Sequence, residues 1–280
     1  MKKCLVFADT TREVVRKALD DALPLIRSHV DAEVYDLSAA IEGECGPAEF
    51  AIVFGGDGSI LRVARILGPN QVPTIGVNIG KFGFLAEINP EQLHRLMDSL
   101  ASGEFKVVSR MMLHTRATRG GEVLRESLAL NDTVISRGSR SRMISIGLTI
   151  DDEHVTDYNG DGIIISTPVG STAHSLAAGG SILEANLRAF AITPICPHTL
   201  SNRPLVIPSE RQIDLVVNRA DVAVGLTMDG QVYSDLQTGD HVRVWRAEKD
   251  FQLIQTGMRS YYKTLHTKLG WGGHPNYGNR

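Results

Sequence analysis

The sequence is poor in cysteine and has no long apolar run. Its three cysteines, Cys4, Cys45 and Cys196, are far apart and odd in number, which argues against a disulfide framework and against a CxxC metal or redox site. No run approaches the roughly 18 apolar residues that a membrane span requires. The first apolar stretch, Cys4–Ala8, is too short for the core of a signal peptide. We therefore expect a soluble, cytoplasmic protein with no membrane partner.

An excess of charge of one sign is also absent. The 280 residues include 29 Lys and Arg against 32 Asp and Glu, which gives a net charge of −3. A protein that binds nucleic acid by neutralising phosphates is normally basic, so we expect no nucleic-acid partner. Hydrophobic residues make up 42% of the chain, enough for a sizeable core, and the length favours two domains.

The first hundred residues alternate between short apolar runs and segments with helical spacing. Strands are expected at Cys4–Ala8, Glu33–Leu37, Phe50–Phe54 and Val72–Val77. Helices are expected at Thr11–His29, Ser59–Leu67 and Pro90–Leu100, the last with Asn89 as its N-cap. Strands that are apolar throughout and separated by helices indicate a parallel sheet covered on both faces.

From about Phe105 the chain consists of short β-rich segments separated by turn residues such as Asp151-Asp152. This pattern is typical of an antiparallel sandwich or barrel. The predicted fold is an α/β N-terminal domain with a parallel sheet (residues 1–104) and a β-rich, sandwich-like C-terminal domain (residues 105–256). Within the second domain, Pro194–Pro208 carries four prolines and is expected to be a rigid loop.

The segment Gly55-Gly56-Asp57-Gly58-Ser59 directly follows the apolar strand Ala51–Phe54. Glycines let the backbone approach a ligand closely, and the first N–H groups of a helix attract an anion, usually phosphate. A carboxylate beside such a phosphate is repelled by it. Asp57 therefore makes sense as the acceptor of a proton from an attacking hydroxyl, or as the holder of a metal that bridges the phosphates. A helix cap alone would explain Asp57 but not the three glycines.

Better-known motifs are absent. The dinucleotide fingerprint GxGxxG fails because Leu61 occupies the third glycine position. A P-loop fails because Gly76–Lys81 is one residue short and Phe82 replaces the Ser or Thr. Neither HExxH nor HxxEH occurs, which disfavours a zinc site, and the absence of GxSxG removes the common hydrolase interpretation.

Three further segments are open to two interpretations each. Asp161–Ile182 contains a strand, a turn and a short helix, which either carries ordinary caps or holds ribose or phosphate at its N-terminus. Asn131-Asp132 either ends a strand or bridges ribose hydroxyls or an adenine edge. Asp229-Gly230 is typical of a two-residue hairpin turn.

In combination, these segments resemble the NAD kinase family over most of the chain. The resemblance is carried in order by GGDGS (Gly55–Ser59), GVNIGKFGFLAEI (Gly76–Ile88), LNDTVI (Leu130–Ile135), DGIIISTPVGSTAHSLAAGG (Asp161–Gly180), TPICPHTLSNRPLVIP (Thr193–Pro208) and MDGQ (Met228–Gln231). GGDG alone is weakly specific, because diacylglycerol-type lipid kinases and phosphofructokinases are similar there. The ordered combination is specific.

The resemblance implies an enzyme that transfers the γ-phosphoryl of ATP, or of inorganic polyphosphate, to the 2′-hydroxyl of the adenosine ribose of NAD, giving NADP. It implies ATP and NAD as partners and a divalent cation, Mg²⁺, carried by the ATP phosphates rather than by a protein motif. It further implies a homodimer or homotetramer. The C-terminal segment, residues 257–280, would return to the first domain and end in a flexible tail.

The resemblance also assigns site residues. Asp57 matches the family's proton acceptor, and Gly55, Gly56, Gly58 and Ser59 form its phosphate loop. Asn131 and Asp132 match the pair at the ribose and adenine. The expected NAD-binding residues are Gly58, Arg62, Asn131, Asp132, Arg142, Asn159, Asp161, Thr172, Ala173, His174, Ser175, Leu176, Ala177 and Gln231.

The sequence departs from the family pattern at four of these positions. His174 stands where Tyr is usual, and its smaller ring stacks less extensively on a ligand. Ser59 replaces a common Thr, Asp132 a frequent Glu, and Asn159 a common basic residue. The alternatives to an NAD kinase are a lipid kinase that shares GGDG and a non-catalytic dinucleotide-binding regulator.

Overall fold

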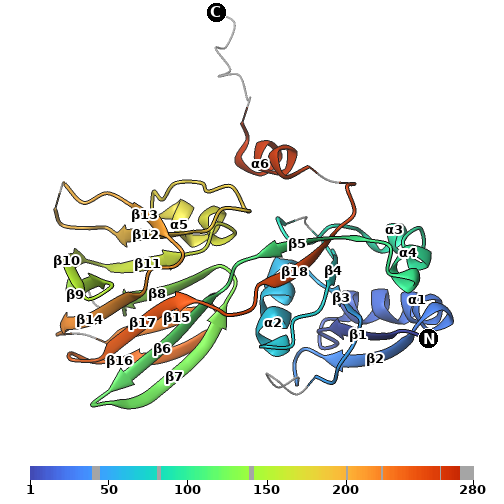
Figure 1. Cartoon of the computed structure of the whole chain (residues 1–280), viewed down its shortest axis with the longest axis horizontal. Coiled ribbons are helices and arrows are strands. Elements are labelled where there is room, and N and C mark those ends of the chain that lie inside the picture. Colours follow the sequence, from blue (N-terminus) through green and yellow to red (C-terminus); the bar gives the residue numbers. More distant parts are fainter. Residues whose placement is uncertain are drawn as a thin grey trace, which may run out of the picture.

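The computed structural model describes residues 1–39, 45–80, 83–138, 142–199, 201–221, 223–258 and 260–271. Two domains lie side by side, and the last helix, α6 (Tyr261–Leu269), lies above the junction between them (Figure 1). Among the described residues, no helix is both long and apolar enough to cross a membrane.

The first domain is built on a six-stranded sheet with the order β2-β1-β3-β4-β18-β5. Its strands are β1 (Lys3–Ala8), β2 (Asp31–Asp36), β3 (Phe50–Phe54), β4 (Thr74–Val77), β5 (Lys106–Arg110) and β18 (Phe251–Gln255). All neighbouring pairs are parallel except β18 with β5. The structure thus confirms the predicted parallel α/β sheet.

Helices cover both faces of this sheet. They are α1 (Glu13–His29), α2 (Asp57–Leu67), α3 (Pro90–Leu93) and α4 (Met97–Ser102). Alternate side chains of β3 point to opposite faces, so that Phe50 packs in the cluster with α1, α3 and α4 while Ala51 packs in the cluster with α2. The single helix predicted over Pro90–Leu100 is instead two short helices, the first with a capping box between Asn89 and Gln92.

The second domain is an antiparallel sandwich, as predicted. One sheet has the order β10-β9-β14-β17-β6-β7 and the other β13-β12-β11-β8-β15-β16. The strands of the first are β6 (Leu113–Arg119), β7 (Glu122–Ala129), β9 (Ile144–Ile150), β10 (Glu153–Gly160), β14 (Ile213–Arg219) and β17 (His241–Arg246). Those of the second are β8 (Asp132–Arg137), β11 (Gly162–Ser166), β12 (Ala189–Ile195), β13 (Leu205–Pro208), β15 (Val224–Met228) and β16 (Val232–Leu236). Their inner faces form one apolar core.

The expectation of a rigid loop over Pro194–Pro208 was wrong at both ends. Pro194 lies in β12 and Pro208 in β13, where it pairs with Ala189. β13 is the outer strand of its sheet, and an outer strand tolerates proline because one side of its backbone needs no partner. β12 in turn pairs with β13 only through residues 189–192, so Pro194 lies beyond that contact.

Two chain segments cross between the domains. One runs from β5 to β6 and the other from β17 to β18, and the Ala247 N–H of the second donates to the Met112 carbonyl of the first at 2.8 Å. Because β5 and β18 both belong to the first sheet, that sheet extends past residue 104 and is re-entered before residue 257. Helix α6 follows, and its Tyr261 hydroxyl donates to the Leu183 carbonyl of the second domain at 3.1 Å.

Candidate active site

Asp57 is the first residue of α2, and its carboxylate is held by backbone N–H groups of a neighbouring loop. Oδ2 accepts from Phe84 at 2.7 Å, and Oδ1 accepts from Leu85 at 3.0 Å and Ala86 at 3.3 Å. A Cβ atom on Gly83 would overlap this carboxylate, so glycine is needed at that position. Each carboxylate oxygen has two lone pairs. Oδ2, with one bond to the described residues, therefore keeps an acceptor position for a ligand hydroxyl.

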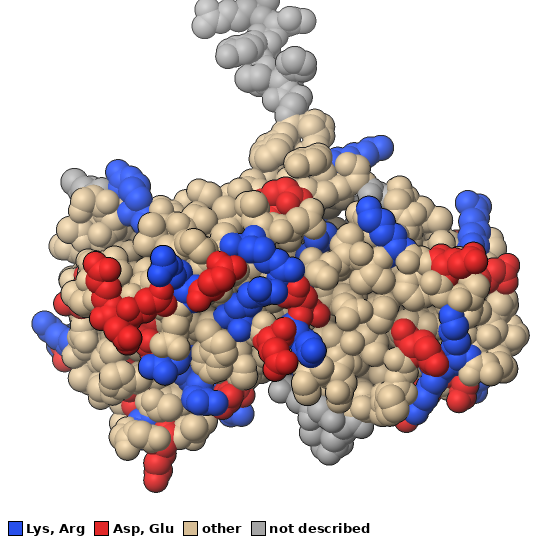
Figure 2. All heavy atoms as spheres, in the orientation of Figure 1, with Lys and Arg blue, Asp and Glu red and all other residues tan. Residues whose placement is uncertain are grey.

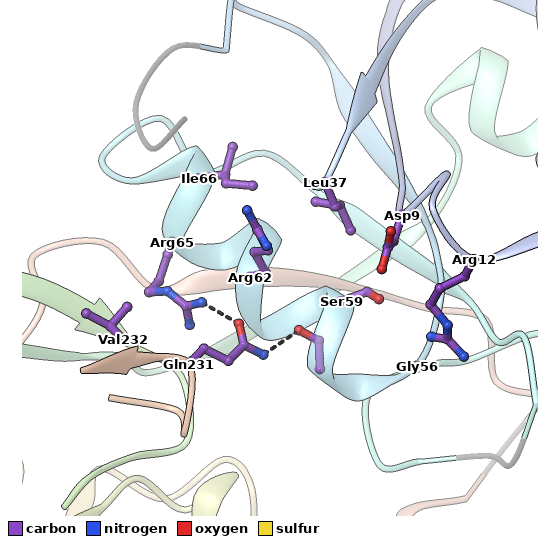
Figure 3. A pocket seen from close by; sticks show the side chains of 11 residues that line it. Asp9, Arg12, Leu37, Gly56, Ser59, Arg62, Arg65, Ile66, Gln231 and Val232 are labelled. Atoms are coloured by element: carbon purple, nitrogen blue, oxygen red, sulfur yellow. Dashed lines mark hydrogen bonds between the residues drawn. The ribbon is translucent and has the colours of Figure 1, made fainter. Parts of the chain in front are cut away.

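A cavity of about 610 Å³ lies along α2, from Gly56 at its start to Ile66 near its end (Figure 3). Its lining residues come from four parts of the chain and are Asp9, Arg12, Leu37, Gly56, Gly58, Ser59, Arg62, Arg65, Ile66, Gln231 and Val232. They include three arginines and the glycines that flank Asp57. Guanidinium groups and helix N-terminal N–H groups both favour an anion, so the cavity suits the phosphates of a nucleotide.

Charge of both signs is interspersed on the face of the molecule seen in Figure 2, which agrees with the small net charge.

The predicted residues Gly56, Gly58, Ser59 and Arg62 line the cavity directly. Gly55 lies buried at the end of β3, where its N–H donates to the Val77 carbonyl at 2.9 Å.

Asp9 and Arg12 line the same cavity but were not predicted from the sequence. They follow β1, whose carboxyl end lies at the same edge of the sheet as that of its parallel neighbour β3. Ligands of open α/β sheets bind at this edge, and that rule was the available signal.

Asn131 and Asp132 lie where β7 leads into β8, and a third residue clamps them. The Asp229 carboxylate accepts hydrogen bonds from the backbone N–H groups of Leu130 (3.0 Å), Asn131 (2.7 Å) and Asp132 (3.2 Å). Asp132 is 4% exposed, and burial, with the nearby charge of Asp229, raises the pKa of its carboxyl to about 7. Asp229 does lie in the turn of the β15–β16 hairpin, but three residues, 229–231, separate the paired strands where two were predicted, and the buried clamping role of Asp229 was missed.

Residues 172–177 occupy the short helices η1 (Gly170–Thr172) and α5 (His174–Ala177) next to this clamped segment. The Thr167 N–H donates to the Asn131 carbonyl at 2.9 Å, and Gly170 packs so closely on that carbonyl that a Cβ atom would overlap it. Ser175 is buried and shares a 2.9 Å hydrogen bond with the Thr193 hydroxyl, whereas His174 is exposed. Of the other predicted residues, Thr172 ends η1, Ala173 lies between the two helices, and Leu176 and Ala177 lie on α5.

Arg142, Asn159 and Asp161 lie elsewhere in the second domain. Arg142 and Asn159 line a separate pocket of about 350 Å³ together with Arg219 and Asp221. Asp161 forms an ion pair with Arg137 at 2.6 Å, and this contact holds the pKa of its carboxyl below the ordinary value. Within one chain, the structure therefore does not bring these three residues to the cavity beside α2.

Gln231 does reach the cavity. Its side-chain N–H donates to the Gly58 carbonyl at 2.8 Å, and its side-chain oxygen accepts from Arg65 (Figure 3). An arginine-lined cavity beside a carboxylate that can accept a hydroxyl proton defines a site for phosphoryl transfer to an alcohol.

Comparison with known proteins identifies the family. The model of the ATP-NAD kinase N-terminal domain matches residues 6–105, and that of the ATP-NAD kinase C-terminal domain matches residues 130–256. The NAD kinase of Geobacter sulfurreducens is 40% identical over 89% of this chain and 88% of its own length. That of Geotalea daltonii is 38% identical over 97% of this chain and 99% of its own length.

Solved structures agree. An NAD kinase from Archaeoglobus fulgidus in complex with ATP has a TM-score of 0.76 at 25% identity and covers 96% of this chain and 99% of its own. A yeast NADH kinase complexed with NADH shares the fold, with a TM-score of 0.87 at 23% identity over 100% of this chain and 90% of its own. The chain belongs to the NAD kinase family, and its activity is the phosphorylation of NAD to NADP. No match described above supports a lipid kinase or a non-catalytic regulator.

Proposed function

We propose that the chain transfers the γ-phosphoryl of ATP to the 2′-hydroxyl of the adenosine ribose of NAD, with Asp57 as the proton acceptor. The observation that carries this assignment is the Asp57 carboxylate, which three backbone N–H groups orient and which lies between two glycines that line the arginine-lined cavity. Its remaining acceptor position on Oδ2 suits a substrate hydroxyl.

In this proposal the cavity beside α2 holds the triphosphate. Arg12, Arg62 and the N–H groups at the start of α2 face its negative charge. The ribose oxygen forms a bond to the γ-phosphorus while the bond from that phosphorus to the β,γ-bridging oxygen breaks, and ADP leaves. The hydroxyl proton passes to Asp57. Because the transition state of such transfers is largely loose, alignment of the two substrates supplies much of the acceleration.

NAD is proposed to bind on the other side of Asp57, against the second domain. Asn131 and Asp132 would contact the ribose and adenine, and the segment Thr172–Ala177 would hold the rest of the dinucleotide, with His174 stacking on it. The proximity of these two segments to each other supports the assignment.

A divalent cation, Mg²⁺, fits this site as a companion of the triphosphate. Mg²⁺ takes oxygen ligands and is usually held by one or two carboxylates together with substrate phosphates. Asp9 provides one carboxylate at the cavity, where its Oδ1 also accepts the Thr11 N–H at 3.2 Å. The cation would neutralise phosphate charge. Among the described residues there is no cluster of three or more His, Cys, Asp or Glu side chains that could hold a metal alone.

The substitution Asp57→Asn tests the role of the carboxylate. We expect turnover to fall by roughly 10²–10⁴-fold, because a general base contributes about that much, while the affinity for NAD stays within a few-fold. NADP formation from NAD, ATP and Mg²⁺ in a coupled assay gives kcat, and titration calorimetry gives NAD affinity. Polyphosphate in place of ATP shows which donor is used.

Asp98→Asn is the matched control, because Asp98 is an almost fully exposed carboxylate on α4. It should leave both kcat and NAD affinity unchanged. If Asp57→Asn reduced turnover and NAD affinity in equal proportion, Asp57 would be a binding residue rather than a proton acceptor.

We also infer a cytoplasmic homodimer or homotetramer. Sedimentation equilibrium of the purified chain measures the assembly directly.

A further inference from the structure

A buried ion pair connects the helix that begins with Asp57 to the segment that carries Asn131 and Asp132. Nη1 of Arg65 lies 3.0 Å from Oδ2 of Asp229. The Arg65 side chain is 4% exposed and that of Asp229 0%. Burying two charges costs desolvation free energy, and two apolar residues of similar size in the same place would avoid this cost.

On the side of the first domain, the pair controls the position of α2. Arg65 lies two turns after Asp57 on this helix, and its Nη1 also donates to the Leu61 carbonyl at 3.4 Å. Its Nη2 donates to Gln231, which in turn donates to the carbonyl of Gly58, the residue after Asp57, at 2.8 Å. The hairpin that carries Asp229 and Gln231 thus holds α2 both at its start and near its end.

On the side of the second domain, Asp229 fixes the backbone of the NAD-binding segment. It accepts three N–H groups there, those of Leu130, Asn131 and Asp132, and its own N–H donates to the Asp132 carbonyl at 2.9 Å. Asp229 has φ +52°, a conformation that Asn and Gly adopt in hairpin turns as well as Asp. An aspartate is therefore not required by the turn but is required by Arg65 and the three amides.

We propose that Asp229 and Arg65 are positioning residues, which set the distance between the Asp57 carboxylate and the ribose hydroxyl of bound NAD. The Asp229 side chain has no exposed surface and so acts only through its neighbours. The assignment rests on the proposed role of Asp57. In addition, this ion pair aligns the proposed ATP-binding residues of the first domain with the proposed NAD-binding residues of the second. Alignment matters because a displacement of about 1 Å can cost about 10²-fold in rate.

Asp240 provides a matched control for a purely structural role. Its carboxylate is 1% exposed and accepts from Arg119 Nε at 2.9 Å and Nη2 at 2.8 Å, as well as from the Gln237 N–H at 2.7 Å. All of these partners belong to the second domain. Asp240 therefore resembles Asp229 in being a buried carboxylate paired with one arginine, with one backbone N–H donor where Asp229 has three, but it does not connect the domains.

The test compares Asp229→Asn with Asp240→Asn in the full chain. Both should lower the unfolding temperature, because both leave an arginine without its charge partner. Asp229→Asn should also lower kcat by about 10-fold or more at a temperature where circular dichroism shows it folded, with the KM for ATP within about threefold. Asp240→Asn should keep kcat within about twofold.

Arg65 variants complete the test. Arg65→Met should lower kcat as Asp229→Asn does, and the double variant should lose no more than the larger of the two single losses, because both break one interaction. Arg65→Lys keeps the charge at Asp229 but cannot also reach Gln231, so its kcat should lie between those of Arg65→Met and the wild type.

Two results would overturn the proposal. One is a folded Asp229→Asn or Arg65→Met protein with kcat within about twofold of the wild type. The other is a double variant whose loss is the product of the single losses. If Asp229→Asn cannot be obtained folded, the comparison of kcat between Arg65→Lys and Arg65→Met is the test. Equal kcat values for these two variants would overturn the proposal. A wild-type-like Asp57→Asn would instead contradict the proposed function.

Discussion

At the scale of single residues, Asp132 and Asp229 show how burial sets the behaviour of a carboxyl group. Both are aspartates beside one another and largely withdrawn from water. Burial also raises the pKa of Asp229, and Arg65 and three N–H donors oppose that rise without cancelling it. Asp132 has burial and the charge of Asp229 acting in the same direction, so that its pKa rises to about 7. At neutral pH, Asp132 is thus divided between a form that accepts hydrogen bonds and a form that can also donate one.

This difference predicts a pH-dependent stability. The folded chain retains a proton on Asp132 that the unfolded chain releases above about pH 4. The stability that the folded state gains from protonated Asp132 is therefore fully present below about pH 4 and is lost as the pH rises through about 7. Asn does not titrate, so the unfolding temperature of Asp132→Asn, relative to the wild type, should rise by about 2 °C or more between about pH 5 and 8.

Thermal unfolding of the ligand-free proteins at several pH values measures this difference. Asp161→Asn is the control, because Arg137 lowers the pKa of Asp161 and its stability term is lost only at more acidic pH. The Asp161→Asn difference should stay constant across that range. A constant difference for Asp132→Asn as well would show that Asp132 is ionised throughout.

At the scale of elements, helix α2 and the loop that begins at Gly83 form one unit. The helix supplies the Asp57 carboxylate and N–H groups for an anion, and the loop supplies the N–H groups that orient the carboxylate. The helix has apolar residues such as Ile60 and Val63 buried on the sheet, which fixes its axis. The loop in turn orients one side chain of that helix, the Asp57 carboxylate.

Gly83→Ala isolates the contribution of the loop. The added methyl group would occupy the space of the Asp57 carboxylate, so we expect the carboxylate to be displaced and kcat to fall by about 10-fold or more. The unfolding temperature should change by only a few degrees, because Gly83 is partly exposed in a loop. In Asp57→Asn, where the base is already lost, the same substitution should cost little further activity. Wild-type kcat in Gly83→Ala would show that the carboxylate position is not critical.

At the scale of the whole molecule, the two domains share an apolar core. Leu130 and Val169 of the second domain belong to the same buried cluster as Leu61 of α2 and Leu85 of the adjoining loop. Met112, in one of the crossing segments, lies in this cluster as well. The domains are therefore held together by packing in addition to the Arg65–Asp229 pair and the two chain crossings.

Shared packing predicts that the domains unfold together. We expect one calorimetric transition, and Leu130→Ala should lower the free energy of unfolding by about 2–5 kcal/mol, since Leu130 is fully buried. Leu148→Ala, at a fully buried position inside the sandwich, should cost a similar amount without affecting contact between the domains. Leu130→Ala should therefore reduce the agreement between calorimetric and van't Hoff enthalpies more than Leu148→Ala does. Two resolved transitions in the wild type would contradict this prediction.

The sequence by itself determined the architecture and pointed to Asp57 as the centre of the candidate site. Apolar strands such as Phe50–Phe54, separated by helical segments, can only be buried on both faces, and short alternating segments after residue 105 require a second sheet. The glycines around Asp57 could be interpreted locally, because backbone freedom and helix N-terminal N–H groups are properties of neighbouring residues.

Only the tertiary structure decided which distant groups meet. Arg65 and Asp229 are 164 residues apart, and Asp57 is oriented by amides 27 to 29 residues away. Nothing in the run around Asp229 distinguishes a buried charge from an exposed hairpin turn, because desolvation depends on what packs above it. The strand position of Pro208 was unpredictable for a related reason. Proline is tolerated in a strand at the edge of a sheet, and only the sheet order reveals which strand lies there. Local patterns specify elements, whereas pairing and burial exist only after the chain has folded.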